Sequence, residues 1–408
     1  MNRESSLLSR VIAAGALVVM VLGASQYGVK IKGVNVSPVD PLIWALFAVW
    51  IVDRARCRTL CSIVPPPAAV MLLIAASVLS GVGAVNRLEV AKEALQWVEY
   101  FGLAFVLFAA QGRESRMFRT MVRVFLILTT AIVVWAFVQY LDRSIDPFKV
   151  RAGFGNRNIL GGFLSISLPL AFSLLLTDAR WGARLWLAVT LAIGATVVLS
   201  GGTYLGVSVA LLGIAVVRGR LAFAATAAAL LVWTCFVTPH LPRENSRIMT
   251  ESVSLFGENG DPTPRCTEWQ AALSMWQENR MVGVGAGNYQ SNIGRYYGYL
   301  PRPNRNLTEP DSHNLYLVLM SSVGLVGLMA FIAVLAVFAG KAASTAARAA
   351  DPWIRSVALG ALGSLTAFSI NGVWSGLLVR GLGIPLALVL GLIAAAYESN
   401  TRPAWDVT

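Results

Sequence analysis

Apolar and polar residues in this chain segregate into long blocks instead of alternating. Apolar residues dominate twelve blocks, at approximately 11–29, 41–52, 63–83, 93–111, 119–140, 159–177, 184–200, 203–217, 221–238, 314–340, 355–373 and 377–397. Most of them approach or reach the roughly 17–25 residues with which a helix crosses a bilayer. Backbone in lipid has to satisfy its own hydrogen bonds, so such blocks are expected to be helical. The pattern predicts an all-α polytopic membrane protein with about twelve transmembrane helices.

The segments between the blocks are short, with one exception at 239–312. We therefore expect a single integral membrane domain over 1–408, with 239–312 as a large loop inside it. In this loop Trp269, Leu273 and Trp276 recur at helical spacing and predict a short amphipathic helix of the kind that lies at a membrane interface. The stretch "GVGAGNYQ" at 283–290 predicts a turn with close backbone approach.

Composition and charge give the chain its orientation. Hydrophobic residues make up 56% of the 408 positions and charged residues 13%, which excludes an ordinary soluble domain. If the N-terminus is cytoplasmic, the inner segments hold 17 of the 33 basic residues and the short outer loops hold 9. The positive-inside rule then favours cytoplasmic N- and C-termini and places 239–312 outside the cytoplasm.

The net charge of +12 does not indicate a nucleic-acid partner, because about half of the basic residues are topology signals that face anionic membrane lipid. Four cysteines and two histidines imply neither a disulfide framework nor a His-rich zinc site. We expect no metal and no cofactor.

One of the two histidines stands in "EPDSHNLYLVLMSSVGLVG" at 309–327, where polar chain meets a long apolar block. In one interpretation His313 is a capping or headgroup-level residue beside Asp311 and Ser312, which are typical of a helix start. In the other, the imidazole accepts a proton from a hydroxyl, with Asp311 or Glu309 orienting it.

Arginines in the outer segments are the second candidate feature. Arg151 and Arg157 flank a glycine-broken segment before an apolar block, and Arg265 precedes the predicted loop helix. Guanidinium groups that point between helices can clamp phosphate oxygens, and a base beside such a clamp suggests substitution with a phosphate leaving group. The alternative is a solvated connector whose arginines reach to the interface.

Three stretches resemble the bacterial O-antigen ligase and polymerase family of membrane glycosyltransferases: "RAGFGNRNILGGFLSISLPL" (151–170), "RCTEWQAALSMWQENRMVGVGAGNY" (265–289) and "DSHNLYLVLMSSVGLVGL" (311–328). The resemblance implies transfer of a glycan from undecaprenyl pyrophosphate to an acceptor hydroxyl, on lipid A-core or a growing polysaccharide, in lipopolysaccharide biosynthesis. It also implies an inverting, metal-independent reaction at the periplasmic face. The partners it implies are the lipid-linked glycan donor, that acceptor and membrane lipid.

The resemblance also implies residue roles. His313 matches the family histidine that serves as base, and Arg265 matches the loop arginine that holds pyrophosphate. The expected substrate-binding residues are Arg151, Asn156, Arg157, Asn158, Asp311 and Asn314.

Two positions depart from the family pattern. Arg157 stands where a proline is often found, and Gly201 stands where many ligases carry an arginine. Arg151, Arg157 or Arg380 could supply the missing charge, and both a ligase and a polymerase remain open. The alternative class is a twelve-helix secondary transporter or polysaccharide exporter, although no half-to-half similarity of the kind found in transporters is visible.

Overall fold

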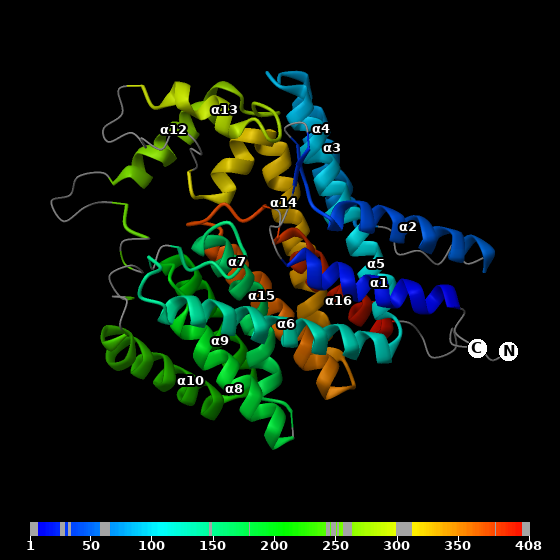
Figure 1. Cartoon of the computed structure of the whole chain (residues 1–408), viewed down its shortest axis with the longest axis vertical. Helices are drawn as coiled ribbons and strands as arrows, with labels where there is room; N and C mark the ends of the chain where they lie inside the picture. The colour runs from blue at the N-terminus through cyan, green and yellow to red at the C-terminus, as the bar shows by residue number, and fades with distance from the viewer. Residues whose placement is uncertain are drawn as a thin grey trace.

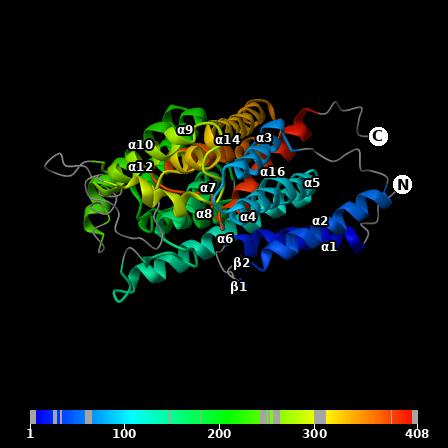
Figure 2. The ribbon, with the colours of Figure 1, turned by 90° about the horizontal axis from the view of Figure 1, so that it is seen from above.

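The computed structural model is a bundle of helices with one short hairpin, as Figures 1 and 2 show. It describes residues 7–24, 29–31, 34–57, 66–146, 149–178, 180–241, 245, 250, 253–255, 263–298, 312–379 and 381–401.

A helix lies at every one of the twelve predicted apolar blocks. The helices of these blocks are α1 (Leu7–Gly23), α2 (Val39–Arg56), α3 (Ala68–Leu79), α4 (Arg87–Trp97) with α5 (Phe105–Gly112), α6 (Ser115–Leu141), α7 (Arg157–Leu175), α8 (Trp181–Thr196), α9 (Gly201–Arg218), α10 (Arg220–Val232), α14 (Leu315–Arg348), α15 (Pro352–Asn371) and α16 (Gly383–Thr401). Shorter turns are η2 (Ser80–Val82), η5 (Trp233–Val237), η6 (Thr238–His240) and η7 (Gly294–Tyr296). The predicted loop helix is α12 (Pro264–Glu278), and α13 (Tyr289–Ile293) follows it.

Within the described residues, eight helices are long and apolar enough to cross a membrane. The other four blocks form α1, α2, α3 and α8, which are shorter or more polar: α3 has 12 residues, α8 has 16, and α2 carries Asp40, Asp53, Arg54 and Arg56. The chain is therefore a multi-pass membrane protein, and the number of twelve crossings remains a prediction.

The centre of the bundle is built from α7, α15 and α16, whose apolar windows are 89%, 61% and 78% buried. Small residues let α15 lie close to its neighbours. A Cβ at Gly206 of α9 would meet the Ala367 carbonyl oxygen at 2.5 Å, and one at Gly360 would meet the Leu170 Cα at 2.8 Å. Close backbone approach through glycine is typical of membrane helix packing. In contrast, only 11% of the α10 window is buried, so α10 lies at the edge, where lipid can cover it.

The block at 93–111 is a single helical path interrupted by a π-helix, η3 (Val98–Ala104), between α4 and α5. Its second residue, Glu99, is 4% exposed, and the Trp44 indole N–H donates to its Oε1 at 2.7 Å. The buried carboxyl group of Glu99 therefore has a hydrogen-bond donor from α2.

One departure from the all-α prediction is a hairpin of β1 (Val29–Ile31) and β2 (Val34–Val36), paired antiparallel with Val29 opposite Val36. The segment "VKIKGVNV" alternates apolar and polar residues around a glycine, which is the local signal for a hairpin. The predicted first block extended to residue 29, whereas α1 ends at Gly23.

The end of α1 and the start of α16 lie together. A Cβ at Gly23, where α1 ends, would meet Ile384 at the start of α16 at 2.6 Å, so the two helices run antiparallel. At the other end of α16, Glu398 pairs with Arg113 just after α5, at 2.8 Å. The beginning of α1 and the end of α16 are therefore at the same end of the bundle, as expected for termini on one side of a membrane.

Candidate functional site

Three helices begin, and α15 ends, at one end of the bundle, which we call the site end. The Leu315 N–H at the start of α14 donates to the carbonyl of Gly372, just past α15, at 2.7 Å. Close below, Asn371 Nδ2 donates to Ser165 Oγ of α7 at 3.1 Å. A Cβ at Gly202, in the first turn of α9, would meet Trp374 Cβ at 2.9 Å. The starts of α7, α9 and α14 thus surround the chain that leaves α15.

His313 lies at this end, directly before the residue that caps α14. The cap is Asn314, whose side-chain oxygen accepts from the N–H groups of Tyr316 and Leu317, both at 3.0 Å. His313 itself is half-buried with φ at +50°. A left-handed conformation is uncommon for a residue with a side chain. The interpretation of His313 as the helix cap is therefore wrong, since Asn314 fills that role.

Contacts from two other elements hold this segment in place. The Trp269 indole N–H of α12 donates to the Ser312 carbonyl at 3.0 Å. Ser312 is fully buried, and its hydroxyl donates to the Asn314 carbonyl at 3.3 Å. Together with the bond between Leu315 and Gly372, these contacts tie both sides of His313 to rigid helices.

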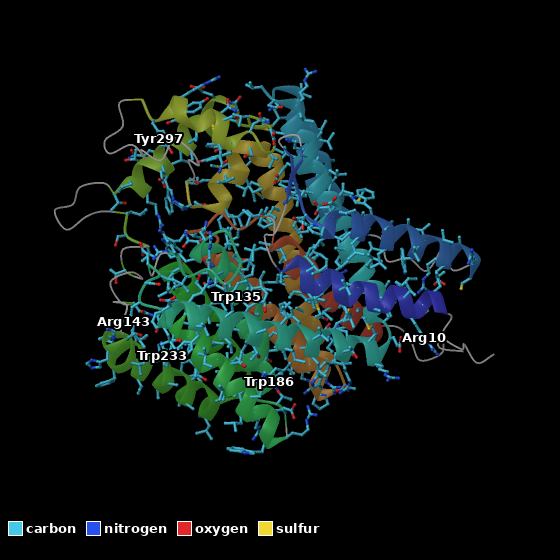
Figure 3. All side chains as sticks on the ribbon, viewed as in Figure 1. Arg10, Trp135, Arg143, Trp186, Trp233 and Tyr297 are labelled. Carbon is cyan, nitrogen blue, oxygen red and sulfur yellow. The ribbon has the colours of Figure 1, made fainter. Side chains whose placement is uncertain are left out.

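The helices α12 and α13 form a cap over the first turns of α14. Their shared core consists of Ala271, Ala272, Met275, Val284, Tyr289, Ile293 and Tyr297, with Leu317 and Val318 of α14 packed against it. Figure 3 shows Tyr297 in this cap, well separated from Trp186 of α8 in the bundle. The face of α12 that carries the small residues Ala271 and Ala272 packs inward. Leu273, on the face for which the sequence predicted membrane contact, is 39% exposed. At the edge of the cap the Tyr296 hydroxyl donates to Glu278 at 2.7 Å. Burial is the larger cause, and this hydrogen bond the next, of a raised pKa of the Tyr296 hydroxyl.

The glycine turn of the cap docks into a break in α14. Gly324 interrupts this helix with φ at +69°, and a Cβ there would meet the Met281 carbonyl oxygen at 2.0 Å. Backbone bonds then cross the break: the N–H groups of Val284 and Gly285 donate to the Ser321 and Ser322 carbonyls, both at 2.9 Å, and the N–H of residue 325 donates to the carbonyl of residue 280 at 2.9 Å. The predicted close approach of "GVGAGNYQ" is confirmed, and its target is α14, the helix that begins two residues after His313.

Arg265 stands in the first turn of α12, four residues before Trp269. Residues four apart share a face of a helix, so Arg265 lies on the face from which Trp269 reaches Ser312. The half-buried Arg265 and the half-buried His313 therefore belong to neighbouring, mutually anchored segments.

The predicted signature at 151–158 is a tight loop that leads into α7. Gln139 Oε1 accepts from the N–H groups of Arg151 and Ala152, at 3.0 and 2.9 Å. The exposed Arg151 side chain donates to the Gly155 carbonyl at 3.3 Å, so this guanidinium folds onto its own loop instead of pointing between helices. Asn156 caps α7 by accepting from the Ile159 N–H at 3.0 Å.

The remaining predicted site residues divide into two groups. Arg157 and Asn158 are half-buried in the first turn of α7, at the site end. Asp311, Glu309 and Arg380 lie outside the described residues.

The electrostatic character of the site end follows from its helices. The N-termini of α7, α9 and α14 meet there, and each carries N–H groups without partners inside its helix. Together with Arg157 they make a region that favours anions, since helix N-termini carry positive partial charge. The structure thus gathers positive potential at the end of the bundle where His313 lies.

Two buried polar residues of this region were not predicted. Glu268 of α12, one turn from Arg265, is 3% exposed, and Asn371 at the end of α15 is fully buried. A signal for Glu268 exists in the sequence, because an acid three residues after a candidate arginine shares its helical face. No sequence signal identifies Asn371, since its partner Ser165 is distant in sequence and is brought to it only by packing.

Comparison with known proteins gives a family match for the middle of the chain. A family model described as O-antigen ligase matches residues 160–332. No curated protein matches the chain. The matched segment runs from the first turn of α7 through α12 and the cap to the middle of α14, and it includes Arg265 and His313, whereas Arg151 to Asn158 precede it. This match, over the helices that build the site end, supports the O-antigen ligase and polymerase family.

Proposed function

We propose that this protein transfers a glycan from undecaprenyl pyrophosphate to an acceptor hydroxyl at the periplasmic face of the bacterial inner membrane. The match to the O-antigen ligase family supports glycosyl transfer, with a lipid-linked glycan and a glycan acceptor as the general substrate classes. The lipid carrier, the acceptor and the side of the membrane are part of the proposal.

In the proposed reaction His313 is the base. Its imidazole takes the proton of the acceptor hydroxyl while that oxygen attacks the anomeric carbon of the donor sugar. The bond from this carbon to the phosphate oxygen breaks, and undecaprenyl pyrophosphate leaves with the electron pair. Attack from the face opposite the leaving group inverts the configuration, and the proton on His313 then passes to solvent.

Arg265 is proposed to hold the leaving pyrophosphate. A guanidinium can donate two parallel hydrogen bonds to two phosphate oxygens. Its positive charge stabilises the negative charge that develops on the leaving pyrophosphate as the bond to the sugar breaks. The N-termini of α7, α9 and α14 add positive potential at the site end. This arrangement supports stabilisation of the leaving group by protein groups, in keeping with a metal-independent reaction.

The observation that carries the proposal is the backbone of His313. A left-handed residue, fixed from α12 and α15 and followed at once by a capped helix, points to a side chain that is held for a purpose other than packing or capping. Strained residues of this kind cluster at active sites.

The pair His313→Asn and His313→Ala tests this role. Asparagine tolerates left-handed backbone well, so His313→Asn should insert and fold like wild type, yet it lacks a base. A positioned base contributes roughly 10²- to 10⁴-fold, and both variants should lose glycan transfer by about this factor. The measurement is transfer from purified lipid-linked donor in detergent.

A control for the substitution itself is His240→Asn. His240 is the other histidine, exposed at the end of η6, and this variant should keep wild-type transfer. Near wild-type transfer by His313→Asn would mean that the base lies elsewhere.

The same assay separates the alternatives from the proposal. A secondary transporter or polysaccharide exporter would move its substrate across vesicles and would form no new glycosidic bond in detergent. Within the family, deletion of the gene distinguishes the acceptors. Long chains left on the carrier would indicate a ligase, and single units attached without modal chain length would indicate a polymerase.

A further inference from the structure

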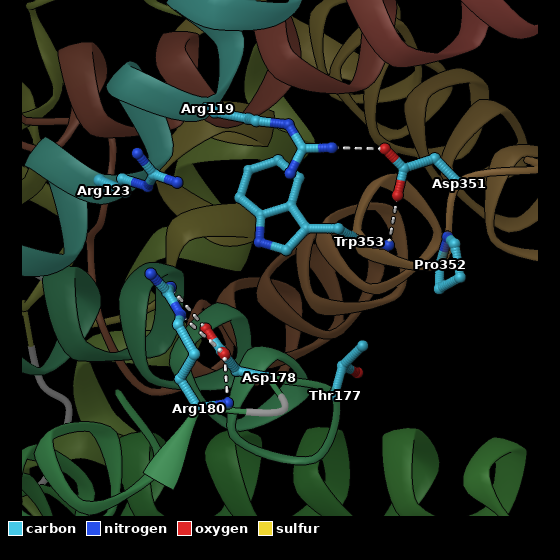
Figure 4. A pocket seen from close by; sticks show the side chains of 8 residues that line it. All are labelled: Arg119, Arg123, Thr177, Asp178, Arg180, Asp351, Pro352 and Trp353. Atoms are coloured by element: carbon cyan, nitrogen blue, oxygen red, sulfur yellow. Dashed lines mark hydrogen bonds and ion pairs between the residues drawn. The ribbon is translucent and has the colours of Figure 1, made fainter. Parts of the chain in front are cut away.

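The end of the bundle opposite His313 contains a polar cavity of about 320 Å³, shown in Figure 4. We call it the far-end pocket. It is formed where α6 begins, where α7 turns into α8 and where α15 begins, and its lining is Arg119, Arg123, Thr177, Asp178, Arg180, Asp351, Pro352 and Trp353.

Both carboxylates of the far-end pocket are already engaged. Asp351 Oδ2 accepts from Arg119 Nη2 at 2.6 Å, and Asp351 Oδ1 accepts from the Trp353 N–H at 2.8 Å. Asp178 accepts from Arg180 Nε at 3.2 Å and from Arg180 Nη2 at 2.9 Å, which lowers the pKa of its carboxyl group. Two arginines are therefore neutralised inside the pocket.

Arg123 is the third guanidinium, and nothing in the described part of the chain pairs with it. It is exposed, it lies one helical turn from Arg119 on α6, and it makes no hydrogen bond or ion pair to any described residue. Figure 4 shows its side chain in the same cavity as those of Arg119 and Arg180. The pocket thus carries one uncompensated positive charge.

Two helix N-termini at the pocket add positive potential, and the C-terminus of α7, which also lies here, opposes it. The far-end pocket lies at the N-termini of α8 and α15 and beside the first turns of α6. Glu114 precedes α6 without a side-chain cap, and the first turn of α6 has no acidic residue. Arginines near a helix N-terminus are disfavoured by the helix dipole. A bound anion would therefore be attracted both to the arginines and to the positive partial charge of the helix N-termini.

The walls of the pocket suit the edge of a bilayer. Arg119 lies over the Trp353 ring, 4.8 Å from its centroid, and the neighbouring Trp181 is 76% exposed. Tryptophan is enriched at membrane interfaces, and α6, α7 and α15 are candidate membrane spans that begin or end here.

We propose that the far-end pocket binds the phosphate group of an anionic ligand, and that the headgroup of an anionic bilayer lipid is the source its position favours. Arg123 forks onto the phosphate oxygens, and Arg119 and Arg180 supply the surrounding field. This site is separate from the proposed glycan transfer, because it lies at the other end of the helices.

The test measures ligand binding to the purified protein in neutral detergent. The probes are short-chain phosphatidylglycerol, short-chain phosphatidylcholine and glycerol phosphate, and the readout is the concentration dependence of the thermal unfolding midpoint. Wild-type protein should bind phosphatidylglycerol and should bind phosphatidylcholine much less. Arg123→Gln should weaken phosphatidylglycerol binding roughly fivefold, and Arg123→Lys should recover part of it.

The matched control is Arg116→Gln. Arg116 is an exposed arginine on the same helix that does not line the pocket, so this variant should bind like wild type. Equal losses in Arg116→Gln and Arg123→Gln would mean diffuse attraction to the surface and would overturn the proposal, as would equal binding of both lipids. If glycerol phosphate binds as tightly as the lipid with the same dependence on Arg123, the phosphate site stands and its ligand is soluble.

Discussion

At the scale of single residues, backbone conformation singles out a candidate position at the site end. Among the described residues other than glycine, Ala152 and His313 have a positive φ. One lies in the loop before α7 and the other before α14, and both loops end in an asparagine cap. Left-handed backbone costs about 1–2 kcal/mol in a residue with a side chain. Neighbouring hydrogen bonds offset this cost at both positions, from Gln139 at the first and from Trp269 at the second.

Arg265 provides a prediction at the same scale. Arg265→Lys keeps the charge but loses the planar fork, so transfer should fall at least about tenfold if the guanidinium binds pyrophosphate in two places. The protein should remain folded, which the thermal unfolding midpoint would check. Arg295→Lys, an exposed arginine of the same cap, serves as control and should transfer like wild type. Unchanged transfer by Arg265→Lys would exclude the bidentate role.

The residues of the site were predictable from the sequence only in part. Motif order made His313 and Arg265 candidates, because the matching stretches are local. The sequence did not reveal that Asn314 is the cap and that Arg151 folds onto its own loop, since several neighbouring residues can fill either role. Hydrogen bonds made after folding decide between them.

At the scale of elements, long apolar blocks predicted helices correctly, because a helix in lipid depends mainly on its own composition. The break in α14, the π-helix η3 and the docking of the cap were not predicted. Each depends on a partner distant in sequence: residues 280–285 for the break, and Trp44 beside Glu99 for the π-helix.

The break in α14 leads to a prediction about stability. Gly324→Ala forces a Cβ into left-handed backbone and against the Met281 carbonyl, so it should destabilise the protein by roughly 2 kcal/mol or more. Gly340→Ala in the same helix meets nothing within 4 Å and should stabilise it by up to about 1 kcal/mol. Unfolding midpoints in detergent measure both. Equal midpoints for the two variants would contradict a docked break.

At the scale of the whole molecule, the arrangement of ends leads to a prediction about topology. The beginning of α1 and the end of α16 share one end of the bundle with the far-end pocket helices, and His313 lies at the other. The distribution of arginine and lysine predicts that the first of these ends is cytoplasmic. In a background without native cysteines, Gly260→Cys should react with an impermeant thiol reagent added outside, and Arg116→Cys should react only after the membrane is opened. The reverse pattern would mean that the protein has the opposite orientation in the membrane.

The bond between Leu315 and Gly372 bears on how the protein is made. Two partners of the glycine turn precede α14 in the chain, since the Asn86 N–H donates to Asn288 Oδ1 and the Ala286 N–H donates to Ser80 Oγ, so synthesis delivers these contacts first. The segment around His313, however, is fixed only when residue 372 has been inserted, after both α14 and α15 have been made. A nascent chain that lacks residue 372 is therefore expected to carry an unanchored His313, and the proposed transfer should begin only after α15 has entered the membrane.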